Sequence, residues 1–239
     1  MALAIVDCKI SEKCERSLLI KGFTVLKTTS SKKLPAPLSS HPDMLMFMHG
    51  NSIITSADYC DEAAYFFTDL HEYCPEAKLR FSDECFAEKY PRDAIFNALT
   101  MGRYIFLKED TVSRAVIEYA NENNMEICRV RQGYPACTVL PLGEGHAITA
   151  DNGMMDAMTK VGIDVTLIEN GGISLPPFEY GFIGGASGVY GKTVYFLGDP
   201  KTHPSGEKIL SACERAGYES VALSDEPLSD LGRIIFIEH

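Results

Sequence analysis

The chain repeats one pattern of apolar and polar positions. Each copy opens at a proline, continues as a short apolar segment, turns at a glycine and resumes as a second apolar segment. The prolines are Pro42, Pro91, Pro135 and Pro177, spaced 49, 44 and 42 residues apart. Segments 42–58 and 135–151 both reach a glycine eight positions after the proline and both end in isoleucine, threonine and, finally, alanine–aspartate. Two short apolar runs around a glycine turn predict a β-hairpin in each copy.

Each hairpin is followed by a helical pattern and then by a third apolar strand. A glycine after two of these patterns, Gly162 and Gly217, is typical of a helix C-terminus. Asp58, Asp110 and Asp151 stand at the starts of their helical patterns, where we expect N-caps. The expected helices span residues 59–73, 112–124, 152–162 and 205–217, and the expected third strands span 78–81, 125–130, 163–168 and 218–223.

The two ends of the chain supply the parts of a fifth copy. Residues 1–28 read as strand, helix and strand, and residues 232–239 read as one further strand. Pairing these two ends closes a ring and removes two free sheet edges. We therefore predict an α/β (α+β) fold: one five-fold pseudo-symmetric β/α-propeller of ββαβ units, closed by the last strand. The expected single domain is 1–239, with units of about 42–90, 91–134, 135–176 and 177–228 and a split unit of 229–239 plus 1–41. A doubly wound α/β fold is the alternative, but it does not explain the hairpin before each helix.

The repeat predicts which loops meet. With the strands of a unit named A, B and C, the hairpin makes A and B antiparallel, and the helical crossover makes B and C parallel. The B–helix loops and C–A links therefore share one end of the ring, and we expect a site there around the axis. That end brings together residues able to bind or react, namely Asp7, Cys8, His41, Asp43, Arg92, Asp93, Cys137, Glu169, Asn170, Glu179, Asp199 and His203.

Charge and composition exclude several classes of partner. The formal net charge is −11, which disfavours binding to nucleic acid or to an anionic membrane. The sequence contains no apolar run long enough for a membrane helix and no export signal, so its eight cysteines are expected to be reduced thiols in the cytoplasm. The cysteines show no C-x-x-C spacing, and the glycines show no G-x-G-x-x-G pattern between a strand and a helix. We expect no cofactor and no metal, since His41, Asp43, Asp199 and His203 have no recognisable ligand spacing.

A ring of five ββαβ units whose termini meet in one unit resembles the pentein superfamily, the β/α-propeller of guanidine-modifying enzymes; the chain is similar to a divergent bacterial branch of it. The resemblance implies a Cys nucleophile, a His and carboxylates that grip a guanidinium group, set at the starts of the A strands. Pro91-Arg92-Asp93 resembles the family's Arg-Asp motif and opens the expected unit. Glu169-Asn170-Gly171-Gly172 resembles its Glu-Gly-Gly element with an insertion, one unit late.

The sequence departs from the family at two reactive positions. Phe178-Glu179-Tyr180 stands where the family's His is expected, and Gly232-Arg233 stands where its C-terminal Cys is expected. Cys137, at an A-strand start, and Cys8, on the same end as His203, are the candidate replacement nucleophiles, with His41 and His203 as candidate bases. Buried packing is the alternative role for either cysteine.

Two functions follow from this reading. The first is C–N hydrolysis or transfer on a cationic guanidino or amino compound, by a route that does not use the family's usual Cys. The compound would bind in an acidic axial pocket formed by Asp7, Asp43, Arg92, Asp93, Glu169, Asn170, Glu179 and Asp199. The second is a non-catalytic binding module with a protein partner, similar to the pentein ribosomal anti-association factor of archaea and eukaryotes. The oligomeric state does not follow from the sequence.

Overall fold

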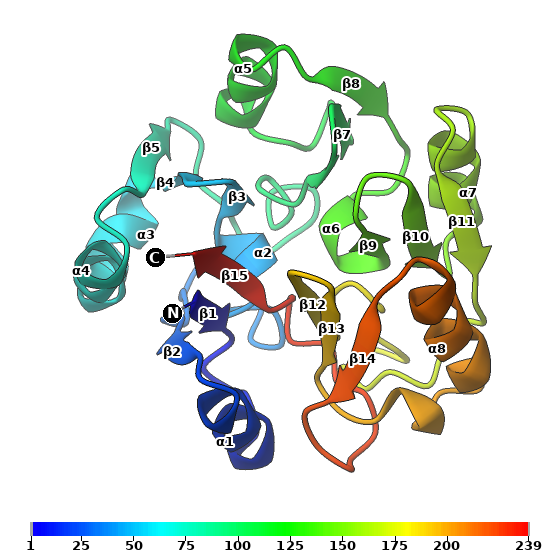
Figure 1. The fold of residues 1–239 in the computed structure, drawn as a ribbon. Helices are drawn as coiled ribbons and strands as arrows, with labels where there is room; N and C mark the ends of the chain where they lie inside the picture. The colour runs from blue at the N-terminus through cyan, green and yellow to red at the C-terminus, as the bar shows by residue number, and fades with distance from the viewer. Residues whose placement is uncertain (1, 239) are drawn as a thin grey trace.

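Five three-stranded sheets form a ring in the computed structural model, which describes residues 2–238 (Figure 1). In each sheet the B strand is central, antiparallel to A and parallel to C, as the repeat predicts. The fold is thus the predicted α/β arrangement of ββαβ units. In the order A, B, C, the first sheet is β3 (Phe47–His49), β4 (Ser52–Ser56) and β5 (Lys78–Ser82), and the second is β6 (Leu99–Met101), β7 (Tyr104–Leu107) and β8 (Glu126–Arg129). The third is β9 (Val139–Leu142), β10 (His146–Thr149) and β11 (Asp164–Leu167), and the fourth is β12 (Ser187–Tyr190), β13 (Thr193–Phe196) and β14 (Glu219–Ala222). The fifth is β15 (Ile235–Glu238), β1 (Ala2–Val6) and β2 (Thr24–Lys27).

The last of these sheets joins the two ends of the chain. β15 pairs with β1, with Ala2 opposite Glu238 and Ile5 opposite Ile235. This pairing confirms that the last strand closes the N-terminal unit; residues 1 and 239 themselves lie outside the described residues.

The crossover helices cover the outside of the ring, while the A strands face its axis (Figure 1). These helices bury one face in the core: Val116 and Tyr119 are buried in one of them, and Ile209 and Cys213 are buried in another. Among residues 2–238 no helix is both long and apolar enough to cross a membrane. The crossover helices are α1 (Glu12–Ile20), α3 (Ala57–Glu62) with α4 (Ala64–Tyr73), α5 (Arg114–Glu122), α7 (Asn152–Thr159), and α8 (Gly206–Arg215) after the 3-10 turn η1 (Pro200–Thr202).

Three local features differ from the sequence-based expectation. The single helix expected at 59–73 is interrupted at Ala63, between α3 and α4. Asp151 caps its helix as expected, but Ser56 and Ser113 cap the helices assigned to Asp58 and Asp110. The A segments of two units begin with a helical turn, α2 (Pro42–Leu45) and α6 (Pro135–Thr138), before the strand starts. A proline at the first helical position favours such a turn, because its missing N–H would be unpaired there in any case.

Candidate functional site

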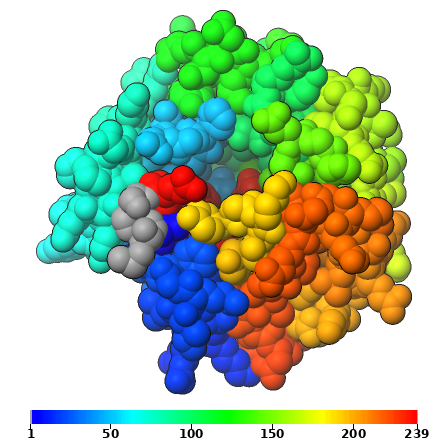
Figure 2. Space-filling view, in the orientation of Figure 1, coloured from blue at the N-terminus to red at the C-terminus, as the bar shows by residue number. Residues whose placement is uncertain are grey.

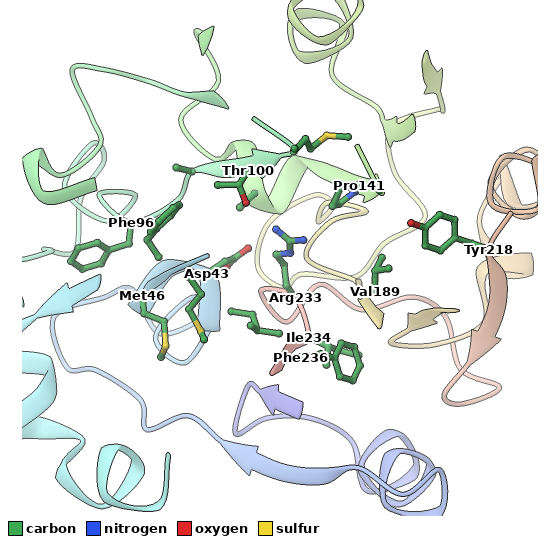
Figure 3. Close-up of a pocket in the computed structure, with 18 residues that line it drawn as sticks. Asp43, Met46, Phe96, Thr100, Pro141, Val189, Tyr218, Arg233, Ile234 and Phe236 are labelled. Atoms are coloured by element: carbon green, nitrogen blue, oxygen red, sulfur yellow. The ribbon is translucent and has the colours of Figure 1, made fainter. Parts of the chain in front are cut away.

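The larger of two cavities beside the axis lies among the A strands, on the hairpin side of the ring. This axial cavity has a volume of about 320 Å³ and reaches the hairpin turns at Gly102 and Gly143. Figure 2 views the ring from the same side as Figure 1 and shows the hollow at its centre. Figure 3 shows the side chains that line it, among them Asp43, Met46, Phe96, Thr100, Pro141, Val189, Tyr218, Arg233, Ile234 and Phe236.

The smaller cavity lies among the C–A links, at the end where the sequence predicts a site. We call it the thiol pocket; its volume is about 180 Å³. Its walls are mainly apolar and aromatic, and its polar groups come from four different links. It is lined by Leu38, His41, Met44, Tyr134, Cys137, Leu175, Phe178, Tyr180, Phe182 and Asp230.

A buried hydrogen-bonded cluster joins the two cavities. Cys137 Sγ in α6 lies 2.9 Å from Asp43 Oδ2 in α2, and it accepts a hydrogen bond from Asn97 Nδ2 at 3.0 Å. Asn97 also donates to the backbone oxygen of Asp43 and accepts from the backbone N–H of Ala136. Since Asp43 lines the axial cavity and Cys137 lines the thiol pocket, this cluster is a thin polar partition between them.

Burial sets the protonation of this cluster. It raises the pKa of Asp43 from 3.8 to about 6, although Cys137, Arg233 and Asn97 each act in the opposite direction. Burial and the neighbouring carboxyl groups of Asp43 and Asp230 raise the pKa of Cys137 well above the ordinary thiol value. The resting cluster therefore pairs a protonated thiol with a carboxyl group that can accept its proton.

His41 lies between two buried carboxyl groups beside the thiol pocket. Its Nε2 is 3.7 Å from Asp7 Oδ2, and its Nδ1 is 3.9 Å from Asp230 Oδ1. These distances exceed hydrogen-bond length, and within residues 2–238 neither ring nitrogen has a hydrogen-bond partner. Burial lowers the pKa of His41 to about 3, so the ring is neutral at physiological pH. A neutral imidazole with a free nitrogen can act as a base.

The link before β15 supplies two further groups. Asp230 accepts from the backbone N–H of Phe182 at 2.8 Å and of Gly232 at 3.1 Å, while burial raises its pKa to about 7. Gly232 and Arg233 both have positive φ, 69° and 72°. For Arg233 this left-handed conformation is uncommon, and it accompanies a side chain that points into the axial cavity (Figure 3).

Two more of the predicted residues lie close to the thiol pocket. Asp93 is buried, and its Oδ2 accepts a hydrogen bond from the hydroxyl of Tyr134, which lines the pocket. Asp7 stands behind His41, where Ser40 Oγ donates to its Oδ1 at 2.6 Å. Both carboxyl groups have a raised pKa because of burial.

The other predicted residues lie outside the two cavities. Cys8, Arg92, Glu169, Asn170 and Glu179 are exposed. Asp199 caps η1, and His203 is buried and accepts a hydrogen bond from the backbone N–H of Ser205. The expectation of an axial cavity lined by many acids therefore needs correction: of the predicted carboxylates, Asp43 lines it, and Arg233 faces it as well. Spacing along the chain indicates the end of the ring on which a residue lies but not its distance from the axis.

Three residues of the site were not predicted as site residues. Asn97, Asp230 and Arg233 all lie shortly before an A strand, in the same part of their units as Asp43 and Cys137. A comparison of the residues at that position in all five units would have revealed these polar and charged side chains from the sequence. Residues 2–238 contain no group of three or more His, Cys, Asp and Glu side chains placed to hold a metal ion.

Comparison with solved structures identifies the fold. DDAH from Pseudomonas aeruginosa, in complex with citrulline, superposes with a TM-score of 0.59 and 8% identity over 94% of this chain and 91% of that one. SxtG, an amidinotransferase from Microseira wollei, gives 0.58 and 13% over 96% and 89%. The N-terminal domain of ArgZ, a cyanobacterial arginine dihydrolase, gives 0.56 and 11% over 94% and 92%.

These similarities establish that the chain has the pentein fold of guanidine-modifying enzymes, the fold that the repeat predicts. A search of curated proteins gave no match. A family model, described as "Family of unknown function (DUF6873)", matches residues 5–235, and the chain therefore belongs to this family.

Proposed function

We propose that this protein breaks a C–N bond of a guanidino compound, either by hydrolysis or by transfer of the amidino group, with Cys137 as the nucleophile. One observation carries the proposal: the thiol of Cys137, the imidazole of His41 and the carboxyl group of Asp230 line the same pocket. The solved structures of similar fold include an amidinotransferase and an arginine dihydrolase, and they suggest the guanidino class of ligand.

The thiol pocket suits a planar cation. Tyr134, Phe178, Tyr180 and Phe182 provide aromatic walls, and an aromatic face attracts a guanidinium group. Asp230 provides the opposite charge, because a bound cation favours its ionised form over the protonated form that burial favours. The volume of about 180 Å³ is enough for the guanidino end of a ligand, whose remainder would extend past the exposed ring of Phe178.

The partition supplies what the thiol needs for attack. Asp43 takes the proton from Cys137, and the amide of Asn97 together with the charge of Arg233 stabilises the thiolate that forms. The sulfur then bonds to the guanidinium carbon. One C–N bond breaks, and the leaving nitrogen takes up the proton held by Asp43. Water, or an acceptor amine in a transfer reaction, next attacks the S-bound carbon while His41 accepts its proton. The C–S bond then breaks, and the proton held by His41 returns to the departing thiolate, which restores the thiol of Cys137 and the neutral imidazole.

Replacing the thiol tests this proposal. Arginine, agmatine and N-methylated arginines would be incubated with the wild type, with Cys137→Ala and with the control Cys213→Ala, whose cysteine is also buried but belongs to α8 and packs in a core cluster away from the pocket. Ureido product and released amine are the readouts. We expect Cys137→Ala to lose at least about 10³-fold of the turnover, as other nucleophile replacements do, and Cys213→Ala to keep it. Undiminished turnover by Cys137→Ala would refute the assignment.

A non-catalytic binding role is the second candidate. It is favoured by the thiol itself, because the pKa of Cys137 is raised and, within residues 2–238, no histidine or lysine hydrogen-bonds to its sulfur. Titration calorimetry decides between the two. Binding of a guanidino compound without product would support this second role, as would recovery of a defined protein partner with the tagged chain.

A further inference from the structure

The axial cavity has a chemistry of its own, separate from that of the thiol pocket. Of the residues that line it, Asp43 and Arg233 are charged, and they point into it from α2 and from the link before β15 (Figure 3). Most of the rest of the wall is apolar, with Met46, Phe96, Val189 and Phe236 among its residues. Its volume of about 320 Å³ lies at the lower end of the range of roughly 300–1,000 Å³ for small-molecule sites.

Both charged groups have polar atoms without a partner among the described residues. Asp43 Oδ2 is engaged by Cys137, but Oδ1 is buried and has no hydrogen-bond partner among the described residues. Within residues 2–238, the guanidinium of Arg233 makes no side-chain hydrogen bond and no ion pair within 4.0 Å, with Asp43 or with any other residue. Unpaired charges next to an apolar wall are costly, and a ligand that pairs with them removes that cost.

Pairing both groups at once restricts the ligand. A simple carboxylate would satisfy Arg233 but place a second negative charge beside Asp43. A simple amine would satisfy Asp43 but place a second positive charge beside Arg233. A molecule with an ammonium and a carboxylate on one carbon satisfies both, because a guanidinium binds a carboxylate through two parallel hydrogen bonds while the ammonium donates to Asp43 Oδ1.

We infer that the axial cavity binds an α-amino acid with an apolar side chain. The carboxylate pairs with Arg233, the ammonium pairs with Asp43 Oδ1, and the side chain lies against Met46, Phe96, Val189 and Phe236. The ligand enters from the hairpin side of the ring, opposite the thiol pocket, so this site is separate from the proposed guanidino site. Binding alone tests it, whether or not the chain is catalytic.

An analogue series on the wild-type protein is the first test. L-leucine, L-methionine and L-phenylalanine would be titrated by calorimetry and thermal shift, alongside leucinamide, which lacks the carboxylate, and N-acetyl-leucine, which lacks the ammonium. We expect the free amino acids to bind and both analogues to bind at least about tenfold more weakly, since each loses one charge-assisted interaction. Failure of all three amino acids to bind at millimolar concentration, or equal binding of either analogue, would overturn the inference.

A pair of arginine variants then assigns the site. Arg233→Met removes the charge from the cavity, whereas Arg16→Met removes one from the exposed face of α1. We expect leucine binding to weaken at least about tenfold in Arg233→Met and to be unchanged in Arg16→Met. Equal binding by Arg233→Met would exclude Arg233 as the carboxylate partner. If that variant does not fold, the analogue series on the wild type still decides the question.

Discussion

Asp43 is the residue on which both proposals depend. One carboxyl oxygen contacts the thiol of Cys137, the other is buried without a hydrogen-bond partner among the described residues, and the residue lines the axial cavity. Burial makes its ionised form unfavourable, and the nearby guanidinium of Arg233 offsets this only in part. A buried carboxyl group in such a setting reduces stability when it is ionised, which is typical of residues retained for function.

The pH dependence of stability should reveal this cost. The pKa of Asp43 is about 6 in the folded chain and near 3.8 when unfolded, so the folded state holds the proton more tightly. The stability due to protonated Asp43 is therefore complete below about pH 4 and is lost as the pH rises through 6. We expect Asp43→Asn, which stays neutral, to gain about 2–3 kcal/mol relative to the wild type between pH 4 and pH 7. Urea unfolding at several pH values measures this gain.

The neighbours of Asp43 and a surface control complete that experiment. The groups that face it are Cys137, a neutral thiol over this range, Asn97, Arg233, which stays positive, and Asp230, whose pKa is about 7. Asp225 is exposed and its pKa is lowered by Lys13, so Asp225→Asn should show the opposite pH trend. If the difference in unfolding free energy between Asp43→Asn and the wild type is the same at pH 4 and pH 7, burial does not raise the pKa of Asp43 as argued.

At this scale the sequence predicted residue types better than distances. Cys137, His41 and Asp43 were predicted because they carry reactive groups on the correct end of the ring, and the structure brings them close to the axis. Glu169 and Glu179 are carboxylates like Asp43 and belong to a C–A link at the same end of the ring, yet both are exposed. Arg233 reaches the cavity through a left-handed backbone conformation. That conformation is rare for residues other than glycine, so the sequence does not predict it at an arginine.

At the scale of elements, the link before β15 is held against the link before β12. Leu231 and Arg233 donate backbone hydrogen bonds to the oxygen of Gly185, and Asp230 accepts one from Phe182. The backbone of Gly185 lies so close to Asp230 that a Cβ there would overlap its carboxyl group. This contact places Asp230 beside the thiol pocket and fixes where β15 begins.

Gly185→Ala should therefore damage both stability and the site. We expect a loss of about 1–3 kcal/mol, since the added methyl group must displace Asp230 or the backbone next to it. Gly145→Ala is the matched control: Gly145 lies in the hairpin turn before β10, its φ is not in the left-handed region, and a Cβ there has no neighbour within 4 Å. Chemical denaturation of both variants measures the difference. Equal stability of the two would show that the two links are not tightly coupled.

The same scale explains which elements were predictable. Strands and crossover helices follow from apolar periodicity and glycine turns, so their order was correct throughout the described chain. The helical turns α2 and α6 were read as strand because they are single turns inside an apolar run. These two turns carry Asp43 and Cys137, and they account for how Asn97 contacts both the backbone oxygen of Asp43 and the thiol of Cys137.

The whole molecule depends on closure of the ring by its two ends. β15 covers the edge of β1, and Phe23, just before β2, packs against Tyr190, Tyr195 and Phe236, with ring centroids 4.9–5.4 Å apart. These contacts tie the split unit to the unit of β12 and β13. The position of the chain break within the ring should matter little, whereas the presence of every strand should matter greatly.

A circular permutant tests this view of the ring. Residues 238 and 2 would be joined by a short glycine–serine linker, and new ends would be opened between Gly50 and Asn51 in the exposed hairpin turn of β3 and β4. This moves the break to the same place in the next unit, so we expect a cooperative thermal transition within a few degrees of the wild type.

Deleting residues 234–238 instead removes β15, exposes the edge of β1 and loses the buried side chains of Ile234 and Ile237. That variant should melt without cooperativity or aggregate, as circular dichroism and size-exclusion chromatography would show. A truncated chain as stable as the wild type, or a permutant that does not fold, would mean that the ring is not held together by its closing strand.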